Sequence, residues 1–134
     1  MVVVGFLVLL VVLLGSCASK PVVWDDSYPE SEMTTVRFAA MTVTSYNGIG
    51  VQKWNTAKFP AGNTSIGADV NIQHGGITFK ATGMEFSYRF DAEKEYQVWG
   101  ATENMNWGVR IYDGLGSKRE PLAFIPFKDQ PVYK

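Results

Sequence analysis

Short runs of β-forming residues, broken at regular intervals by turn residues, constrain the fold of this chain more than any other feature. From Thr34 onward, stretches rich in Val, Ile, Thr, Phe, Tyr and Trp are interrupted about every eight to twelve residues by Gly, Asn, Asp or Pro. No long segment has apolar residues at helical spacing. We predict strands at Thr35–Ala40, Thr42–Tyr46, Val51–Trp54, Thr64–Ile72, Thr78–Ala81, Met84–Phe90, Tyr96–Ala101 and Trp107–Tyr112.

Alternation along these strands indicates which face of each is buried. Over 84–90 the even-numbered residues are Met, Phe, Tyr and Phe, and the odd-numbered ones are polar. In the two later strands the same alternation places Trp99 and Tyr112 opposite the apolar residues. Two sheets packed face to face would bury all the apolar faces. We therefore expect an all-β, antiparallel β-sandwich of about seven to eight strands.

Turn residues separate the predicted strands. Asn47–Gly48 is a strong hairpin signal, because both residues tolerate positive φ. Pro60–Asn63 and Gln73–Gly76 are expected to be further turns. Near the C-terminus, Pro121–Lys128 carries apolar residues between two prolines, which suits an edge strand or a strap across the end of the sandwich. We favour the strap.

An apolar run occupies the N-terminus from Met1 to Gly15 and contains no charged residue. A membrane-spanning helix needs about 20 apolar residues, and this run is shorter. A buried core element is a second alternative, and the apolar region of an export signal is a third. Small residues followed by a cysteine at the end of the run favour the export signal.

Leu14, Gly15, Ser16 and Cys17 resemble the bacterial lipobox, in which lipoprotein signal peptidase cleaves before a lipid-modified cysteine. The resemblance implies that Cys17 carries a diacylglyceryl thioether and becomes the mature N-terminus. An ordinary signal peptide and a retained anchor helix are the alternatives. The positive residues that usually open an export signal do not precede the run. Either the start codon lies a few residues upstream, which we favour, or the export system tolerates an uncharged start.

These features divide the chain into three parts. We expect a helical signal peptide over 1–16, a lipidated N-terminus and flexible tether over 17–33, and the β-sandwich with its strap over 34–134. Trp24, within the tether, either docks on the domain or is an isolated aromatic residue, and we favour the second interpretation. Acyl chains stabilise membrane attachment by about 0.8 kcal/mol per buried methylene. Because Ala18 is not an acidic retention signal, we expect sorting to the outer membrane of the cell envelope.

Composition narrows the chemistry. One cysteine and one histidine exclude an intramolecular disulfide and a zinc site of the usual Cys/His type. Twelve Lys and Arg against thirteen Asp and Glu give a formal net charge of -1, and the basic residues are scattered. We therefore expect no nucleic-acid partner, no metal and no cofactor.

The chain contains no recognisable catalytic motif. His74 lies in a predicted turn without a nucleophile elbow, and His74 with Asp69 gives too few ligands for a metal site. No pattern fixes a pair of carboxylates at the separation of about 5 to 9 Å that glycoside hydrolysis requires. The acids near predicted strand ends, which we interpret as solvated turn charges, are Glu93, Glu95, Glu103 and Asp113.

Exposed aromatic residues are the remaining functional signal. Among Trp54, Trp99, Trp107 and Tyr112, the strand alternation points Trp99 and Tyr112 outward, where they suit a sugar ring or a protein partner. The alternative, which we favour, is that these rings pack beneath the tether or the strap.

The order of features resembles small bacterial lipoproteins with a transthyretin-like or PEGA-like β-sandwich. The resemblance rests on Tyr46–Val51, Phe59–Thr64, Phe86–Phe90, Glu95–Val98 and Trp107–Asp113. It implies a binding or scaffold module of the envelope and brings no catalytic residues. We therefore expect a lipid-anchored, non-enzymatic module that contacts envelope proteins or glycans. The alternative is a carbohydrate-binding or cell-wall-processing protein that uses the aromatic face.

Overall fold

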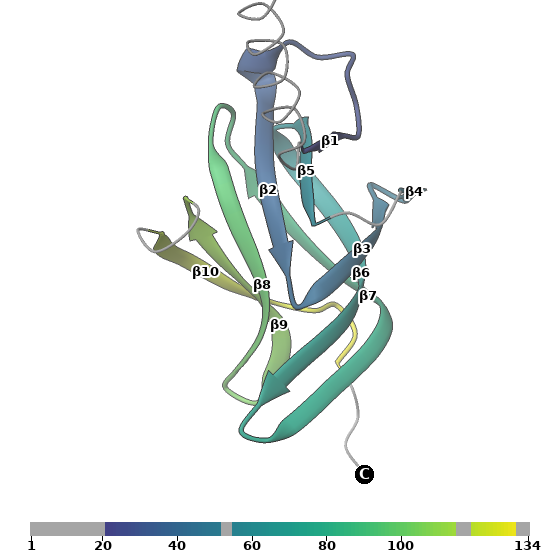
Figure 1. Ribbon diagram of the computed structural model, residues 1–134, viewed down its shortest axis with the longest axis vertical. Helices are drawn as coiled ribbons and strands as arrows, with labels where there is room; N and C mark the ends of the chain where they lie inside the picture. Colours follow the sequence, from purple (N-terminus) through teal and green to yellow (C-terminus); the bar gives the residue numbers. More distant parts are fainter. Residues whose placement is uncertain (1–20, 52–54, 115–118, 131–134) are drawn as a thin grey trace, which may run out of the picture.

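Two β-sheets form the protein (Figure 1). The computed structural model describes residues 21–51, 55–114 and 119–130. A six-stranded sheet has the order β1-β5-β2-β8-β9-β10, and a four-stranded sheet has the order β4-β3-β6-β7. The strands are β1 (Val22–Val23), β2 (Met33–Ala39), β3 (Met41–Tyr46), β4 (Ile49–Gly50), β5 (Thr56–Pro60), β6 (Gly62–His74), β7 (Ile77–Phe90), β8 (Glu95–Glu103), β9 (Asn106–Asp113) and β10 (Glu120–Pro126), and a short 3₁₀ helix (Glu30–Glu32) precedes β2. The all-β prediction is confirmed.

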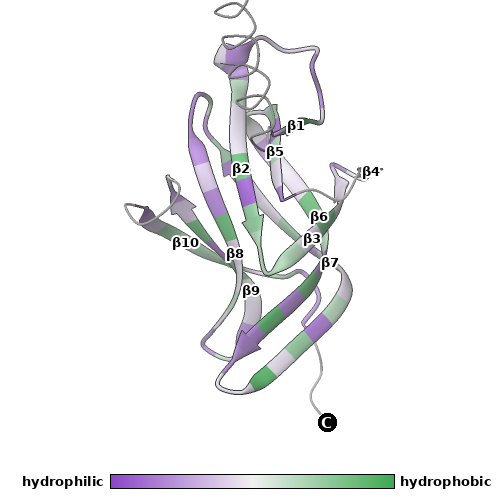
Figure 2. Cartoon of the chain, in the orientation of Figure 1, coloured by the Kyte–Doolittle hydropathy of each residue, from purple (hydrophilic) through white to green (hydrophobic). Residues whose placement is uncertain are grey.

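One hydrophobic core joins the two sheets. Figure 2 shows alternating hydrophobic and hydrophilic bands along β7, as expected of a strand with one buried face. The inward residues of β7 that the alternation predicted, Met84, Phe86 and Phe90, are buried, and Tyr88 is half-buried. The fully buried residues of both sheets form one cluster, which includes Val36, Val43, Phe59, Ile66, Ala68, Phe86, Val98, Val109 and Ile111.

Two hairpin turns lie where the sequence predicted turns. Asn47 and Gly48 both have positive φ, and the Asn47 Oδ1 accepts a 2.9 Å hydrogen bond from the Ser65 N–H, which fixes the β3–β4 turn on β6. Gly75 and Gly76 also have positive φ and connect β6 to β7. The predicted runs 78–81 and 84–90 merge into β7, with a bulge at Gly83 that opposes Asp69.

The six-stranded sheet is mixed rather than purely antiparallel, which corrects one part of the prediction, whereas every pair in the four-stranded sheet is antiparallel. β2 pairs with β8 in parallel, from Thr35 opposite Glu95 to Ala39 opposite Trp99, and β1 pairs with β5 in parallel. The physical reason is the chain path. After β2 the chain crosses to the four-stranded sheet for β3 and β4, returns as β5 on one side of β2, and crosses again for β6 and β7. β8 then enters on the other side of β2, in the same direction as β2.

The C-terminal segment corrects a second expectation. Glu120–Pro126 is an edge strand, β10, which pairs antiparallel with β9 and has a bulge between Pro121 and Ala123. Proline is tolerated in an edge strand, because an edge residue whose backbone points away from the sheet needs no N–H donor. Only the following residues act as a strap: Phe127 is buried, and the Lys128 N–H donates to the Glu85 carbonyl at 2.9 Å.

The N-terminal part of the described chain packs on the domain, so the expectation for Trp24 was wrong. Its backbone N–H donates to the Lys58 carbonyl at 3.0 Å, continuing the β1–β5 pairing. The indole stacks on Phe59 with ring centroids 5.3 Å apart and lies 5.2 Å from the Tyr46 ring. Within the range expected to be a tether, ordered contacts with the sandwich therefore begin at Val22.

Two predicted segments fall wholly or partly outside the described residues. The signal peptide with Leu14, Gly15, Ser16 and Cys17 lies in 1–20, and 52–54 of the predicted strand Val51–Trp54 also lie outside. Val51 itself belongs to no strand, and the next strand, β5, begins at Thr56. In the part of the chain that the structure describes, no helix has the length and hydropathy of a membrane span.

Candidate functional site

The outer face of the six-stranded sheet presents aromatic and cationic side chains in two neighbouring rows. In one row Arg37 of β2, Gln97 of β8 and Tyr112 of β9 lie side by side, because Arg37 and Tyr112 are the register partners of Gln97. In the next row, Trp99 is paired with Arg110. Trp99 and Tyr112 lie on the side away from the core, since their strand neighbours Val98 of β8 and Ile111 of β9 belong to the core cluster.

The start of β10 places an arginine over both outward rings. β10 begins with Glu120 opposite Asp113, which returns the preceding residue, Arg119, to the neighbourhood of Tyr112. The Arg119 guanidinium carbon lies 4.6 Å from the Tyr112 ring centroid and 5.5 Å from that of Trp99. Both distances fall within the range of a cation–π contact. We expected the tether or the strap to cover these rings. Arg119 lies over them instead.

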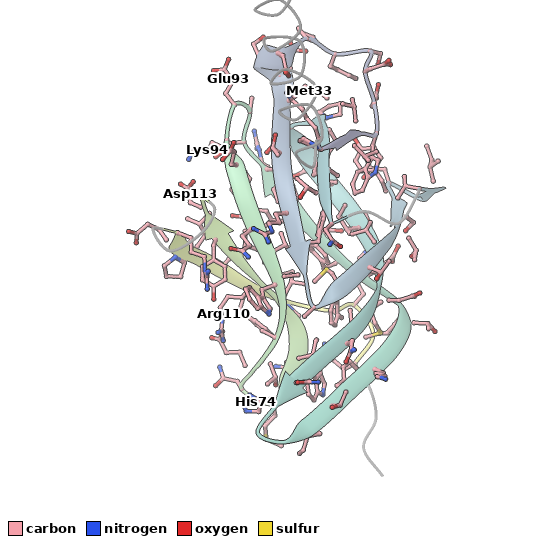
Figure 3. The ribbon with its side chains drawn as sticks, in the orientation of Figure 1. Met33, His74, Glu93, Lys94, Arg110 and Asp113 are labelled. Atoms are coloured by element: carbon pink, nitrogen blue, oxygen red, sulfur yellow. The ribbon has the colours of Figure 1, made fainter. Side chains whose placement is uncertain are left out.

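A groove of about 290 Å³ opens beside these rings. It lies where the end of β6 passes β8, and its floor includes Gly100, whose missing side chain leaves room for Ile72 of the opposite sheet. Trp99 keeps 40% of its surface exposed at this groove. Figure 3 shows Arg110 on the middle of the face and His74 towards the hairpin turns. The lining residues are Ile72, Gln73, His74, Trp99, Gly100, Ala101, Thr102, Arg110, Tyr112 and Arg119.

Charged pairs border the groove. Arg110 lies 3.5 Å from the Glu103 carboxylate, and both side chains are more than a third exposed. Lys94 and Asp113 form a second exposed pair at 3.5 Å near the start of β8 (Figure 3). Exposed pairs of this kind contribute about 0.2–1 kcal/mol, so their partners can exchange for a ligand at small cost.

Gln97 is an unusual member of the outer face. It is only 5% exposed, and its Oε1 is a buried acceptor that receives no hydrogen bond within the described part of the chain. An unsatisfied buried polar atom costs about 1–3 kcal/mol. The face therefore retains a polar side chain where an apolar one would pack at lower cost.

The other residues considered from the sequence do not converge. His74 ends β6 instead of lying in the turn, and Asp69 accepts the Gly83 N–H at 3.1 Å in the bulge. Among the described residues, no three histidines, cysteines or carboxylates come together as a metal site. Glu93 sits in the exposed turn before β8 with a positive φ of 59°, apart from the groove lining.

Two tryptophans considered with Trp99 have different positions. Trp107 points into the sandwich, where it stacks on Phe79 with a centroid distance of 4.3 Å. Its backbone N–H and carbonyl bind the Gln130 side chain, so this residue does lie under the C-terminal strap. Trp54 lies outside the described residues.

Sequence reasoning missed the arginines of the groove. Arg110 shares its strand face with Tyr112, so the alternation of β9 was a usable signal. Arg119 gave no local signal, because its position depends on the register between β9 and β10. His74 was noticed, but its place at the groove depends on the packing of β6 against β8 of the other sheet.

Comparison of the chain with models of protein families, with curated proteins and with solved structures finds no match.

Proposed function

We propose that this chain is a lipid-anchored, non-enzymatic binding module of the bacterial cell envelope, and that the groove beside Trp99 and Tyr112 is its ligand site. The lipobox-like residues Leu14–Cys17 support the anchor. The observation that carries the binding role is the groove itself, in which two outward aromatic rings and two arginines surround a volume of about 290 Å³.

The chemistry of the lining supports binding. Rings with an exposed apolar face and guanidinium groups with many donors are groups that orient a polar ligand. Small-molecule sites usually occupy about 300–1,000 Å³, so this groove suits one small unit, such as a single sugar ring or a short side chain of a larger partner. Membrane attachment through Cys17 would hold such a site at the envelope, with outer-membrane sorting as the default expectation.

A cell-wall-processing enzyme is less well supported by the same site. Hydrolysis of a glycosidic bond needs two carboxyl groups facing each other across the substrate. Among the described residues, the groove lining contains arginines and a histidine but no carboxylate, and Glu103 at its border is engaged by Arg110. Carbohydrate binding without hydrolysis remains consistent with the proposed role.

The anchor is tested by metabolic labelling with a radioactive fatty acid. We expect label on the wild-type chain and none on Cys17→Ala. Cys17→Ser is a second variant that removes the thiol and keeps a small polar side chain. Equal labelling of the wild type and both variants would refute the lipobox assignment.

The groove is tested by fluorescence titration of the full chain in detergent micelles. The ligands are peptidoglycan fragments, N-acetylglucosamine oligomers and acidic oligosaccharides. Because the chain has four tryptophans, every titration is repeated with Trp99→Phe, which keeps a ring but removes the reporting indole. We expect a saturable change that is lost in this variant. If no ligand gives a change that depends on Trp99, the groove is not the binding site.

A further inference from the structure

We propose that the edge of β7 is a dimerisation surface, where the segment Ile77–Ala81 pairs antiparallel with the same segment of a second copy of this chain. The inference goes beyond the proposed function, because it concerns the edge of the four-stranded sheet and not the groove lining. It is carried by the direction of the backbone groups along this edge.

Of the four edge strands in the described part of the chain, β7 is the one that is both long and without proline. β1 and β4 have two residues each, and β10 contains Pro121, Pro126 and a bulge. Short strands, prolines and bulges prevent an edge from pairing with another chain. β7 has 14 residues, and the β6–β7 hairpin lies at the end of the molecule opposite β1 (Figure 1). The edge of β7 therefore has the length and the position to accept another strand.

The hydrogen bonds of β6 show which backbone groups of β7 point outward. Asn71 of β6 is the register partner of Lys80, and its N–H donates at 3.0 Å to the Ala40 carbonyl, on the side of β3. In an antiparallel ladder, the backbone groups of such a pair point away from each other. The N–H and C=O of Lys80 therefore face the edge, and those of Thr78, two residues earlier, do the same. Among the described residues, no further strand pairs with β7 at these positions.

The neighbouring part of the same edge is covered by the C-terminal strap. The Lys128 N–H donates to the Glu85 carbonyl at 2.9 Å, and the Lys128 ammonium lies 3.6 Å from the Glu85 carboxylate. The bulge at Gly83 separates this contact from Thr78 and Lys80, which are both exposed. The strap thus protects the edge beyond the bulge and leaves 77–81 for a partner.

Two-fold symmetry and charge together select one register for this pairing. A ladder centred on Lys80 would place two ammonium groups directly opposite each other, which is destabilising. A ladder centred on Thr78 would place Lys80 opposite Gly76, which lies in the turn. A ladder centred on Phe79 places Thr78 opposite Lys80 of the second copy on both sides of the axis. Each of these two pairs can then exchange both of its backbone hydrogen bonds.

The same register covers apolar surface that the single chain exposes. Ile77 is 65% exposed and lies on the face of β7 that carries Phe79 and Ala81, which pack on the core. Pairing centred on Phe79 places Ile77 beside Ala81 of the second copy. The ladder ends there, because the bulge of one copy meets the Gly75–Gly76 turn of the other. A standard stable interface has about 20–30 residues a side, so this shorter contact should give a weak, reversible dimer.

The test is sedimentation equilibrium of the full chain in density-matched detergent, with micelles in excess over protein. We expect the wild type to associate reversibly into a dimer as its concentration rises. Every variant keeps the same N-terminal segment, so association through that segment would affect all of them equally. The differences between variants therefore report on the edge of β7.

Substitutions of Thr78 test the register. Thr78→Asp places a carboxylate opposite Lys80 of the second copy on both sides of the axis and should lower the dissociation constant of the dimer about fivefold. Thr78→Lys places like charges there and should raise the dissociation constant about fivefold. Thr78→Pro removes an outward N–H that the ladder with β6 does not use and should raise the dissociation constant about tenfold.

Ser87→Asp and Ser87→Lys are the matched controls for the two charge changes. Ser87 is an exposed residue of the same strand, on the other side of the bulge. Both variants should change the dissociation constant less than about twofold. Thermal unfolding of all variants shows which remain folded. If Thr78→Pro does not fold, the opposite effects expected of Thr78→Asp and Thr78→Lys still test the register.

Three results would overturn the inference. The first is a monomer at every concentration. The second is a dimer that responds equally to the Thr78 and Ser87 variants, which would place the contact elsewhere in the chain. The third is a dimer that Thr78→Lys strengthens and Thr78→Asp weakens, because residue 78 would then face an acidic group instead of Lys80. The titrations with Trp99→Phe test the groove separately from all three.

Discussion

Two aromatic clusters in this molecule use the same residue types in opposite ways. The inner cluster consists of Trp24, Phe38, Tyr46 and Phe59, whose rings contact one another where the N-terminal segment joins the six-stranded sheet. The groove aromatics, Trp99 and Tyr112, lie on the outer face of the same sheet and contact a guanidinium.

The neighbours of an aromatic ring decide whether it contributes to stability or to binding. In the inner cluster, the packing of one ring on another removes apolar surface from water and stabilises the fold. In the groove aromatics, both rings contact a cation and Trp99 keeps 40% of its surface exposed, so less apolar surface is buried. We expect the inner cluster to govern stability and the groove aromatics to govern binding. The following experiments test that division of roles.

The largest effect is expected from truncation in the inner cluster. Trp24→Ala removes the ring that contacts Phe38, Tyr46 and Phe59. It should lower the free energy of unfolding by about 3 kcal/mol. The measurement is urea denaturation followed by circular dichroism. Trp99→Ala is the matched control in the groove and should cost less than about 1 kcal/mol. Comparable losses in the two variants would contradict the division.

The next effect concerns the strand that carries Arg119 into place. Gly108 of β9 faces β10 so closely that a Cβ added there would lie 2.8 Å from Pro126 Cα and collide with the Ile125 carbonyl. Gly108→Ala should therefore cost about 2 kcal/mol and weaken ligand binding by displacing β10.

Gly50→Ala is the matched control for this change, because an added Cβ there meets no atom within 4 Å. Thermal unfolding and titration of both variants provide the measurement. If Gly108→Ala retains full affinity, the position of Arg119 does not depend on the pairing of β9 with β10.

Gln97 allows stability and binding to be separated on the outer face. Its buried Oε1 is without a hydrogen-bond donor among the described residues, so Gln97→Leu should raise the free energy of unfolding by about 1 kcal/mol. Differential scanning calorimetry measures the gain. A loss of stability would show that the amide is satisfied in solution, for example by an ordered water.

The smallest effect is a dependence of stability on alkaline pH that comes from one buried and two half-buried tyrosines. Burial raises the pKa of Tyr46, with a contribution from Asp25, and burial also raises the pKa of Tyr88 and Tyr96. A raised folded-state pKa means that the fold favours the neutral phenol. Stability is therefore fully present below pH 10, the ordinary pKa of tyrosine, and decreases as pH rises through the folded-state values.

Unfolding temperatures between pH 8 and about 11.5, with tyrosinate absorbance recorded in parallel, measure this loss. Tyr46→Phe should flatten part of the decline, because it removes one titrating group from the inner cluster. A decline that begins well below pH 10 would point to groups other than these phenols.

Local pattern in the sequence was enough to predict much of the fold. The alternation over 84–90 identified the buried face of β7, and the pair Asn47–Gly48 identified a turn. β5 was missed because Lys58 and Pro60 interrupt its apolar pattern. The parallel pairing of β2 with β8 joins residues about sixty positions apart, and no local pattern encodes such a partner.

The candidate site was predictable to a smaller extent. Alternation alone turned Trp99 and Tyr112 outward, because the side-chain period of a strand is two. It could not show that Arg119 covers both rings, since this depends on the pairing of Glu120 with Asp113. The packing of Trp24 on Phe59 could not be predicted either, because a single aromatic residue in a polar segment carries no periodic signal.

The short distance in sequence between Cys17 and β1 limits how far the domain of the proposed lipoprotein can lie from the membrane. β1 begins at Val22, only five residues after Cys17, and five residues extend at most about 18 Å. An acylated Cys17 would therefore hold the β1 end of the domain close to the bilayer, while the β6–β7 and β8–β9 turns lie at the opposite end of the long axis (Figure 1). The height at which a ligand is captured above the lipid headgroups would then be set by the length of the sandwich itself.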